Sequence, residues 1–241
     1  MLHEVSLDGG LGFCHQELPS LLPPDYHGPL VVALDSNVLI DLQQHGSALM
    51  NDDPLPDQVA ADTAYVQELD GLADLLNTWL LRDIRFVVTP RSKTDAKKLS
   101  KRFLETRLPA IEALAESLAF QLGDWSVPAP SQGLPPTAVG EETGLPEGAD
   151  RDLVLEAQAI GAHVFLTRDR LILERTVLTG PQTVLLSPGT LASELHAAGV
   201  QLFIGGICGD VGCPYAGWPF PAPDMGRWAG LLSILGTPEE H

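Results

Sequence analysis

Three aspartates stand where apolar runs of the sequence begin or end. Asp35 directly follows LVVAL, Asp169 follows HVFLT after one arginine, and Asp150 opens the segment that leads into HVFLT. Carboxylates that share a small volume repel one another unless a proton or a hard cation such as Mg²⁺ or Mn²⁺ lies between them. Such a cation makes a bound water a better nucleophile and neutralises the charge on a phosphate. The pattern therefore predicts a metal-dependent site for phosphodiester hydrolysis.

The segments around these acids alternate between strand and helix patterns. Short apolar runs predict strands at 30–34, 84–89, 163–167 and 183–186. Apolar residues at helical spacing, with capping residues, predict helices at 36–42, 58–81, 92–108, from 109 onward, 150–160 and 188–198. This alternation is typical of a mostly parallel sheet with helices on both faces, a three-layer α/β/α fold. In such sheets functional groups gather beyond the carboxyl ends of the strands, which is where the acids stand.

Composition divides the 241 residues into three parts. Residues 1–28 mix Gly, Pro and apolar residues without a lasting period, which predicts an irregular lead-in. Residues 29–199 hold the α/β domain, and residues 200–241 form a C-terminal extension. Within the domain, residues 127–148 hold five Pro and four Gly in 22 positions, so a mobile loop is expected there.

Two stretches of the sequence resemble the PIN-domain ribonucleases. LVVALDSNVLIDL is similar to the opening strand and first acidic motif of that family, and GADRDLVLEAQAIGAHVFLTRDRLIL is similar to its closing pair of acidic motifs. The resemblance covers about residues 30 to 190, and the second stretch is the more specific. It implies a PIN-like fold and a metal-dependent endoribonuclease that hydrolyses RNA through a metal-activated water, leaving 5′-phosphate and 3′-hydroxyl ends.

The resemblance also implies roles for individual residues. Asp35, Asp150 and Asp169 would bind Mg²⁺ or Mn²⁺, with Asp152 as the substitute for Asp150. Three polar residues would support them, namely Ser36 and Asn37 beside the first acid and Thr167 as the residue that positions phosphate or water.

The chain departs from the family at one acid. The family usually has a Glu in the helix after the second strand, and here VVTPRSKTDAKK offers Asp95 at about that place. Because its side chain is shorter, we expect Asp95 to assist catalysis through a water. An alternative function is a catalytically inactive PIN-like module that binds RNA or protein. A phosphotransferase that uses Asp35 as nucleophile is disfavoured, because Asn37 stands where a second Asp would be expected.

Positive charge is concentrated in one segment. The formal net charge of -18 disfavours non-specific attraction to nucleic acid, yet residues 82–107 hold nine of the 14 Lys and Arg against three acids. This segment carries +6 and the rest of the chain -24. A solvated helix face is one interpretation, and a ridge that contacts single-stranded RNA is the other. The residues expected to bind RNA are Arg91, Lys93, Lys97, Lys98, Lys101 and Arg102.

Each acid also has a structural explanation. Asp35 can serve as a helix N-cap, Asp150 as a cap and Asp169 as a turn residue. Asp41 is expected at the surface or at the rim of the site. Three acids at three element boundaries, in the order found in the family, favour a functional site over three separate structural roles.

The remaining features concern location and partners. Three cysteines, the lack of a basic start followed by an apolar stretch, and the lack of a long uncharged run predict a cytoplasmic protein without a membrane segment. Cys208 and Cys213 form a pair at unusual spacing for which a structural role is expected. Besides RNA, the resemblance implies a small antitoxin-like protein, as in toxin-antitoxin pairs, and a second copy of the chain as partners.

Overall fold

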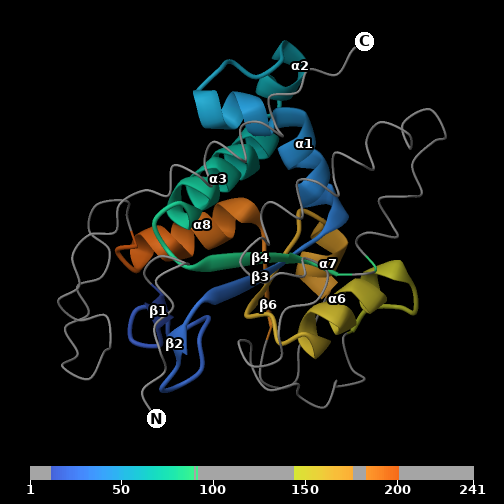
Figure 1. Cartoon of the computed structure of the whole chain (residues 1–241). Helices are drawn as coiled ribbons and strands as arrows, with labels where there is room; N and C mark the ends of the chain where they lie inside the picture. The colour runs from blue at the N-terminus through green and yellow to red at the C-terminus, as the bar shows by residue number, and fades with distance from the viewer. Residues whose placement is uncertain (1–11, 90, 92–143, 176–182, 201–241) are drawn as a thin grey trace.

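The computed structural model describes residues 12–89, 91, 144–175 and 183–200. Four parallel strands form its central sheet in the order β4-β3-β5-β6 (Figure 1). The strands are β3 (Leu30–Leu34), β4 (Ile84–Val88), β5 (Val164–Leu166) and β6 (Val184–Leu186). All four lie within the predicted strands, and the expected α/β architecture with a parallel sheet is confirmed.

Helices cover both faces of the sheet, as expected. On one face lie α1 (Ser36–Asn51), α3 (Thr63–Trp79) and α8 (Pro188–Ala197), and on the other lie α6 (Ala149–Ala159) and α7 (Arg170–Arg175) (Figure 1). A short helix, α2 (Asp57–Ala60), precedes α3. Because side chains alternate along a strand, β3 contributes to both cores. Leu30 and Leu34 face the first core, and Val31 and Ala33 face the second.

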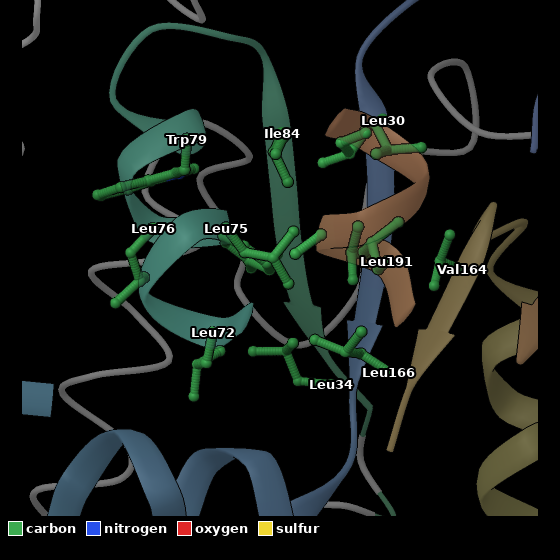
Figure 2. Close-up of a cluster of buried hydrophobic side chains, with 14 of the residues drawn as sticks. Leu30, Leu34, Leu72, Leu75, Leu76, Trp79, Ile84, Val164, Leu166 and Leu191 are labelled. Carbon is green, nitrogen blue, oxygen red and sulfur yellow. The ribbon is translucent and has the colours of Figure 1, made fainter. Parts of the chain in front are cut away.

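The larger core lies under α1, α3 and α8. Side chains of α3 meet those of β3 and β4, and Trp79 is among the largest side chains that are fully buried there (Figure 2). Gly71 of α3 faces α8 so closely that an added Cβ would lie 2.5 Å from the Cα of Gly189. Glu68 accepts hydrogen bonds from the Ser187 hydroxyl at 2.9 Å and from the Gly189 amide at 2.8 Å, which fixes the start of α8 against α3.

The segment before the sheet is more ordered than the irregular lead-in that was expected. Residues 12–28 contain an antiparallel pair of two-residue strands, β1 (Phe13–Cys14) and β2 (His27–Gly28). Phe13, at 0% exposure, packs in the larger core. Arg82 holds Glu17 with two nitrogens, at 2.8 and 3.0 Å, and donates to the Gly12 carbonyl at 2.8 Å.

One buried histidine joins this segment to the sheet. His163 precedes β5 and is fully buried, and its Nδ1 accepts from the Val31 amide at 3.0 Å. Its ring meets that of Tyr26 edge to face, with centroids 4.7 Å apart. Burial lowers the pKa of His163 to about 4, so the ring is neutral near neutral pH.

Two helices differ in extent from their predictions. The helix after β3 was expected to end at Leu42 and runs to Asn51, and the helix expected over 58–81 is divided into α2 and α3. The expected helices at 92–108 and from 109, most of the loop at 127–148, and the extension after residue 200 lie outside the described residues. Among the residues described, none of the helices is both long and apolar enough to cross a membrane.

Candidate active site

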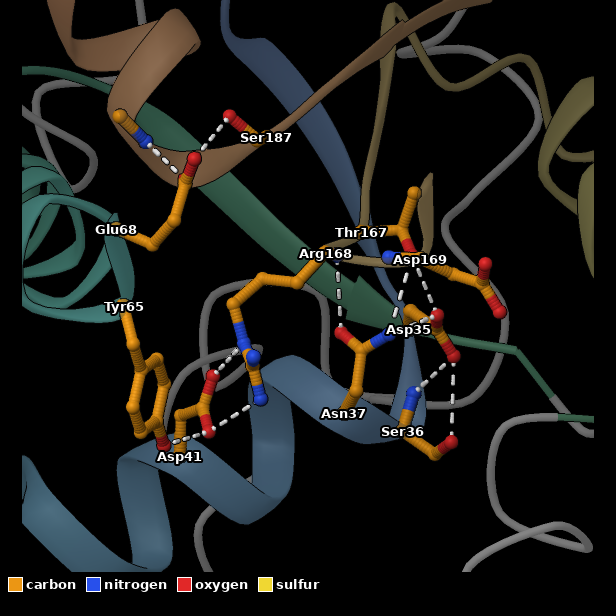
Figure 3. A network of polar contacts seen from close by, with 11 residues as sticks. Asp35, Ser36, Asn37, Asp41, Tyr65, Glu68, Thr167, Arg168, Asp169 and Ser187 are labelled. Carbon is orange, nitrogen blue, oxygen red and sulfur yellow. Dashed lines mark hydrogen bonds and ion pairs between the residues drawn. The ribbon is translucent and has the colours of Figure 1, made fainter. Parts of the chain in front are cut away.

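Asp35 lies between the end of β3 and the start of α1, at the carboxyl edge of the sheet. It is 4% exposed, and its amide donates to the Leu166 carbonyl at 3.0 Å, which ties it to the neighbouring strand β5. Its Oδ1 accepts from the amide and the hydroxyl of Ser36, at 2.6 and 3.2 Å. Its Oδ2 accepts from Asn37 Nδ2 and from Thr167 Oγ1, both at 2.6 Å (Figure 3). Four donors therefore surround this carboxylate.

The groups that donate hydrogen bonds to the Asp35 carboxylate are all neutral. Burial raises its pKa, the hydrogen bonds from Thr167 and Ser36 counteract that rise, and the negative charge of Asp169 adds to it. Within the described part of the chain, no Lys, Arg or His forms an ion pair with Asp35. A cation between Asp35 and Asp169 would offset both the cost of burying the Asp35 charge and the repulsion between the two carboxylates.

Thr167 connects the two acids. It is fully buried directly after β5, donates to Asp35, and accepts from the Asp169 amide at 3.0 Å. Asp169 is half-buried and directly precedes α7, and its Oδ1 accepts from the Leu171 amide at 2.7 Å. The structure thus brings together five of the predicted residues, namely Asp35, Ser36, Asn37, Thr167 and Asp169.

Arg168 fastens the turn between Thr167 and Asp169 to α1. Its amide donates to Asn37 Oδ1 at 3.2 Å, and its guanidinium forms a two-nitrogen ion pair with Asp41, with Nη2 2.8 Å from Oδ1 and Nε bonded to Oδ2 (Figure 3). The Arg168 Cζ lies 4.5 Å from the ring centroid of Tyr65 in α3. The Tyr65 hydroxyl donates to Asp41 Oδ1 at 2.7 Å.

The expectation that Asp41 lies at the surface or rim is wrong. Asp41 is 1% exposed, and burial raises its pKa, partly offset by the Tyr65 hydrogen bond and the Arg168 charge. A buried carboxylate is tolerated here because it is paired and hydrogen-bonded.

Asp150 and Asp152 both lie in the first turn of α6, but their surroundings differ. Asp150 is half-buried. Asp152 is exposed, and its Oδ2 lies 3.3 Å from Nη1 of Arg91. The Arg91 amide also donates to Glu156 Oε2 at 2.8 Å. Arg91, which was expected to bind RNA, and Asp152, expected as a metal ligand, therefore contact each other.

Oxygen ligands at this edge suit Mg²⁺ or Mn²⁺, although the described residues supply only part of a coordination shell. Among those residues, no three His, Cys, Asp or Glu side chains lie together closely enough to hold a metal ion. Mg²⁺ is commonly held by one or two carboxylates, with waters and substrate phosphates as further ligands. Asp35 and Asp169 fit that mode. Since a carboxylate has about four lone-pair sites, a cation on Asp35 would have to replace one of its four present donors.

The predicted basic ridge is described only in part. Arg82 and Arg85, which contribute to its charge, are buried and paired with Glu17 and Asp83. The other predicted ligands and RNA contacts lie outside the described residues, and these are Asp95, Lys93, Lys97, Lys98, Lys101 and Arg102.

Sequence reasoning missed Asp41, Tyr65 and Arg168 as parts of this network. Two signals were present. Asp41 follows Asn37 by four residues and therefore lies on the same face of α1. Arg168 stands between two residues that were assigned to the site.

Comparisons of the chain with models of protein families, with curated proteins and with solved structures find no match.

Proposed function

We propose that the protein is a metal-dependent endoribonuclease of the PIN type. The observation that carries the proposal is the pair Asp35 and Asp169, which follow the neighbouring parallel strands β3 and β5 and interact electrostatically at the carboxyl edge of the sheet. Ligand sites of open parallel sheets lie at this edge. A helix N-cap needs only a short polar side chain accepting from the first turn. Asp35 is buried and also accepts hydrogen bonds from Asn37 and Thr167, and a helix N-cap requires neither of these features.

Each residue of the site has a task in the proposed reaction. Asp35 and Asp169 would hold Mg²⁺ or Mn²⁺, with Asp150 and Asp95 assisting. The metal would supply Lewis acidity toward the phosphate and lower the pKa of a bound water. Ser36, Asn37 and Thr167 would stabilise the ionised form of the Asp35 carboxylate against its burial and fix its direction through their hydrogen bonds.

Single-stranded RNA is the substrate class that suits this edge. Its backbone can bend toward recessed carboxylates, and cations of the segment 92–108 would hold its phosphates. Arg91 has a different task in this proposal, because it contacts α6 through Asp152 and Glu156.

A second candidate is a catalytically inactive module that binds RNA or protein. It is favoured by the four donors that already occupy Asp35, and by the absence of a three-residue metal cluster from the described residues.

Cleavage of a mixed-sequence single-stranded RNA in Mn²⁺, in Mg²⁺ and in EDTA tests the proposal. Wild type, Asp35→Asn, Asp169→Asn and Asp62→Asn are compared. Asp62 is the matched control because it is also an N-cap, accepting from the Tyr65 amide at 3.1 Å, and is exposed. Asn caps helices as well as Asp does.

We expect metal-dependent cleavage by wild type and by Asp62→Asn. In Asp35→Asn and Asp169→Asn the cleavage rate should fall at least about 100-fold, because loss of a metal ligand should cost no less activity than loss of a residue that orients a ligand. Absence of cleavage by folded wild type would favour the inactive module. Equal activity in Asp35→Asn and Asp62→Asn would reduce Asp35 to a helix cap.

A further inference from the structure

The ion pair of Arg168 with Asp41 lies beside the carboxylate pair without belonging to it. Figure 3 shows the Arg168 side chain running from the turn that carries Asp169 toward Asp41 and Tyr65, away from the carboxylate of Asp35. Asp41 is 1% exposed, whereas 29% of the Arg168 side chain is exposed. The Asp41 carboxylate is thus the buried partner of the pair, and the partly exposed Arg168 side chain reaches in to bind it.

Two contacts attach residue 168 to one face of α1. Its amide binds Asn37 and its guanidinium binds Asp41, four residues further along the same helix. Because the two contacts lie one helical turn apart, together they restrain residue 168 against both sliding along α1 and rotation about the axis of α1. Two nitrogens of a planar guanidinium on one carboxylate add directional restraint.

A third contact comes from α3. The Tyr65 ring lies under the guanidinium, and its hydroxyl binds the same Asp41 oxygen that accepts from Nη2. The guanidinium of Arg168 is therefore restrained twice. Its nitrogens bind Asp41 of α1, and its Cζ lies over the Tyr65 ring of α3.

These restraints bear on the distance between the two site carboxylates. Asp35 is the N-cap of α1, and Asp169 follows Arg168 directly. Attaching Arg168 to α1 therefore attaches the residue beside Asp169 to the helix that begins at Asp35. The bond between Thr167 and Asp35 acts at the other side of the same turn.

We propose that Arg168, Asp41 and Tyr65 are positioning residues, which fix the turn 167–169 on α1 and thereby set the spacing of Asp35 and Asp169 that a divalent cation requires. The inference rests on the proposed function. Residues that orient metal ligands without touching the metal commonly change metal affinity or activity by 10- to 100-fold when replaced.

The test compares this ion pair with its structural counterpart elsewhere in the molecule. Asp41→Asn, Arg168→Lys and Tyr65→Phe are set against Glu17→Gln and Arg82→Lys, because Arg82 also holds one carboxylate with two nitrogens over an aromatic ring. Binding of Mn²⁺ alone is measured from the electron paramagnetic resonance signal of the free ion. Cleavage of single-stranded RNA gives kcat and KM, and circular dichroism confirms folding.

We expect Asp41→Asn and Arg168→Lys to weaken Mn²⁺ binding and kcat by about 10- to 100-fold with little change in KM for RNA. Tyr65→Phe keeps both charges and should show the same effects in smaller measure, so it carries the test if Asp41→Asn does not fold. Glu17→Gln and Arg82→Lys should leave Mn²⁺ binding and kcat unchanged even where they lower stability.

The outcomes separate this inference from the proposed function. Wild type that neither binds Mn²⁺ nor cleaves RNA overturns both. Active wild type, with the Asp41 and Arg168 variants affected no more than the Glu17 and Arg82 variants, overturns the positioning role alone.

Discussion

The ion pairs of Arg82 and Arg168 have the same chemistry but opposite burial. Each arginine donates hydrogen bonds to one carboxylate from two of its nitrogens. At Arg82 the cation is 4% exposed and its partner Glu17 is 18% exposed. At Arg168 the cation is 29% exposed and its partner Asp41 is 1% exposed. The first pair buries its positive end and the second buries its negative end.

This difference matches what each pair connects. Arg82 joins the N-terminal segment to the sheet, with its Cζ 4.2 Å from the ring centroid of Phe13, and it lies among other buried residues. Arg168 belongs to the edge where the proposed site lies, and its partial exposure follows from that position. The same pairing of residue types therefore supports the interior in one region and, in the other, attaches the turn that carries residues of the proposed site.

The largest effect is expected on removing the arginine whose partner is the more deeply buried. Arg168→Met leaves Asp41 buried without its cation, and such losses cost about 3–5 kcal/mol of unfolding free energy. Urea denaturation at pH 7 measures it. Because burial then raises the Asp41 pKa further above its unfolded value, stability is retained at low pH and lost as the pH rises through the folded pKa. The defect should therefore shrink in acid, and an equal defect at every pH would contradict it.

Arg82→Met should cost less, about 2–3 kcal/mol. Glu17 is exposed enough to be hydrated once its partner is lost, although the hydrogen bond to the Gly12 carbonyl disappears as well. The same denaturation series measures it. If Arg82→Met lowers the unfolding free energy more than Arg168→Met does, the exposure of the carboxylate left without its arginine does not determine the loss.

The junction between the N-terminal segment and the sheet, which Arg82 and His163 both contact, should also carry a pH dependence that comes from His163. Its folded pKa of about 4 lies below the unfolded value near 6.5, so stability is complete above pH 6.5 and declines as the pH falls toward 4. The contribution is at most about 1.4 kcal/mol per pH unit. His163→Asn keeps an acceptor for the Val31 amide and removes the titration. Thermal denaturation from pH 7 to pH 4 should show a shallower decline in this variant than in wild type.

Tyr65→Phe should have the smallest effect on stability, about 1.5 kcal/mol, the lower end for a hydrogen bond to a charged group. Only the hydrogen bond to Asp41 is lost, while the ring and the Arg168 pair remain. Thermal denaturation measures the loss. A change as large as that of Arg168→Met would mean that the hydroxyl, rather than the guanidinium, stabilises the buried Asp41.

The sequence predicted the sheet well because its strands are short apolar runs whose burial needs no knowledge of their partners. The acid at the end of LVVAL and the Thr-Arg-Asp turn were also found, since strand ends can be located from the pattern alone. The N-terminal segment was expected to be irregular because strands of two residues leave no period to detect. Burial of Phe13 there depends on tertiary contacts that no local pattern encodes.

The burial of Asp41 was missed for a related reason. An aspartate in an amphipathic helix is normally solvated, and only a cation brought from a distant part of the chain reverses that preference. Arg168 lies 127 positions away in the sequence. The spacing of four residues from Asn37 puts Asp41 on the same face of α1 as Asn37, but spacing alone does not show what covers that face.

The strand order has a consequence for the time at which the proposed site forms. β3 pairs with β5, and Asp35 receives the Thr167 hydroxyl across 132 positions of sequence. At a synthesis rate of about 5–20 residues per second, roughly 7–26 s separate the two residues on the ribosome. Throughout that interval the nascent chain contains Asp35 but not yet the turn 167–169, which carries Thr167 and Asp169. Any activity that depends on both acids is therefore withheld until most of the described domain has been made.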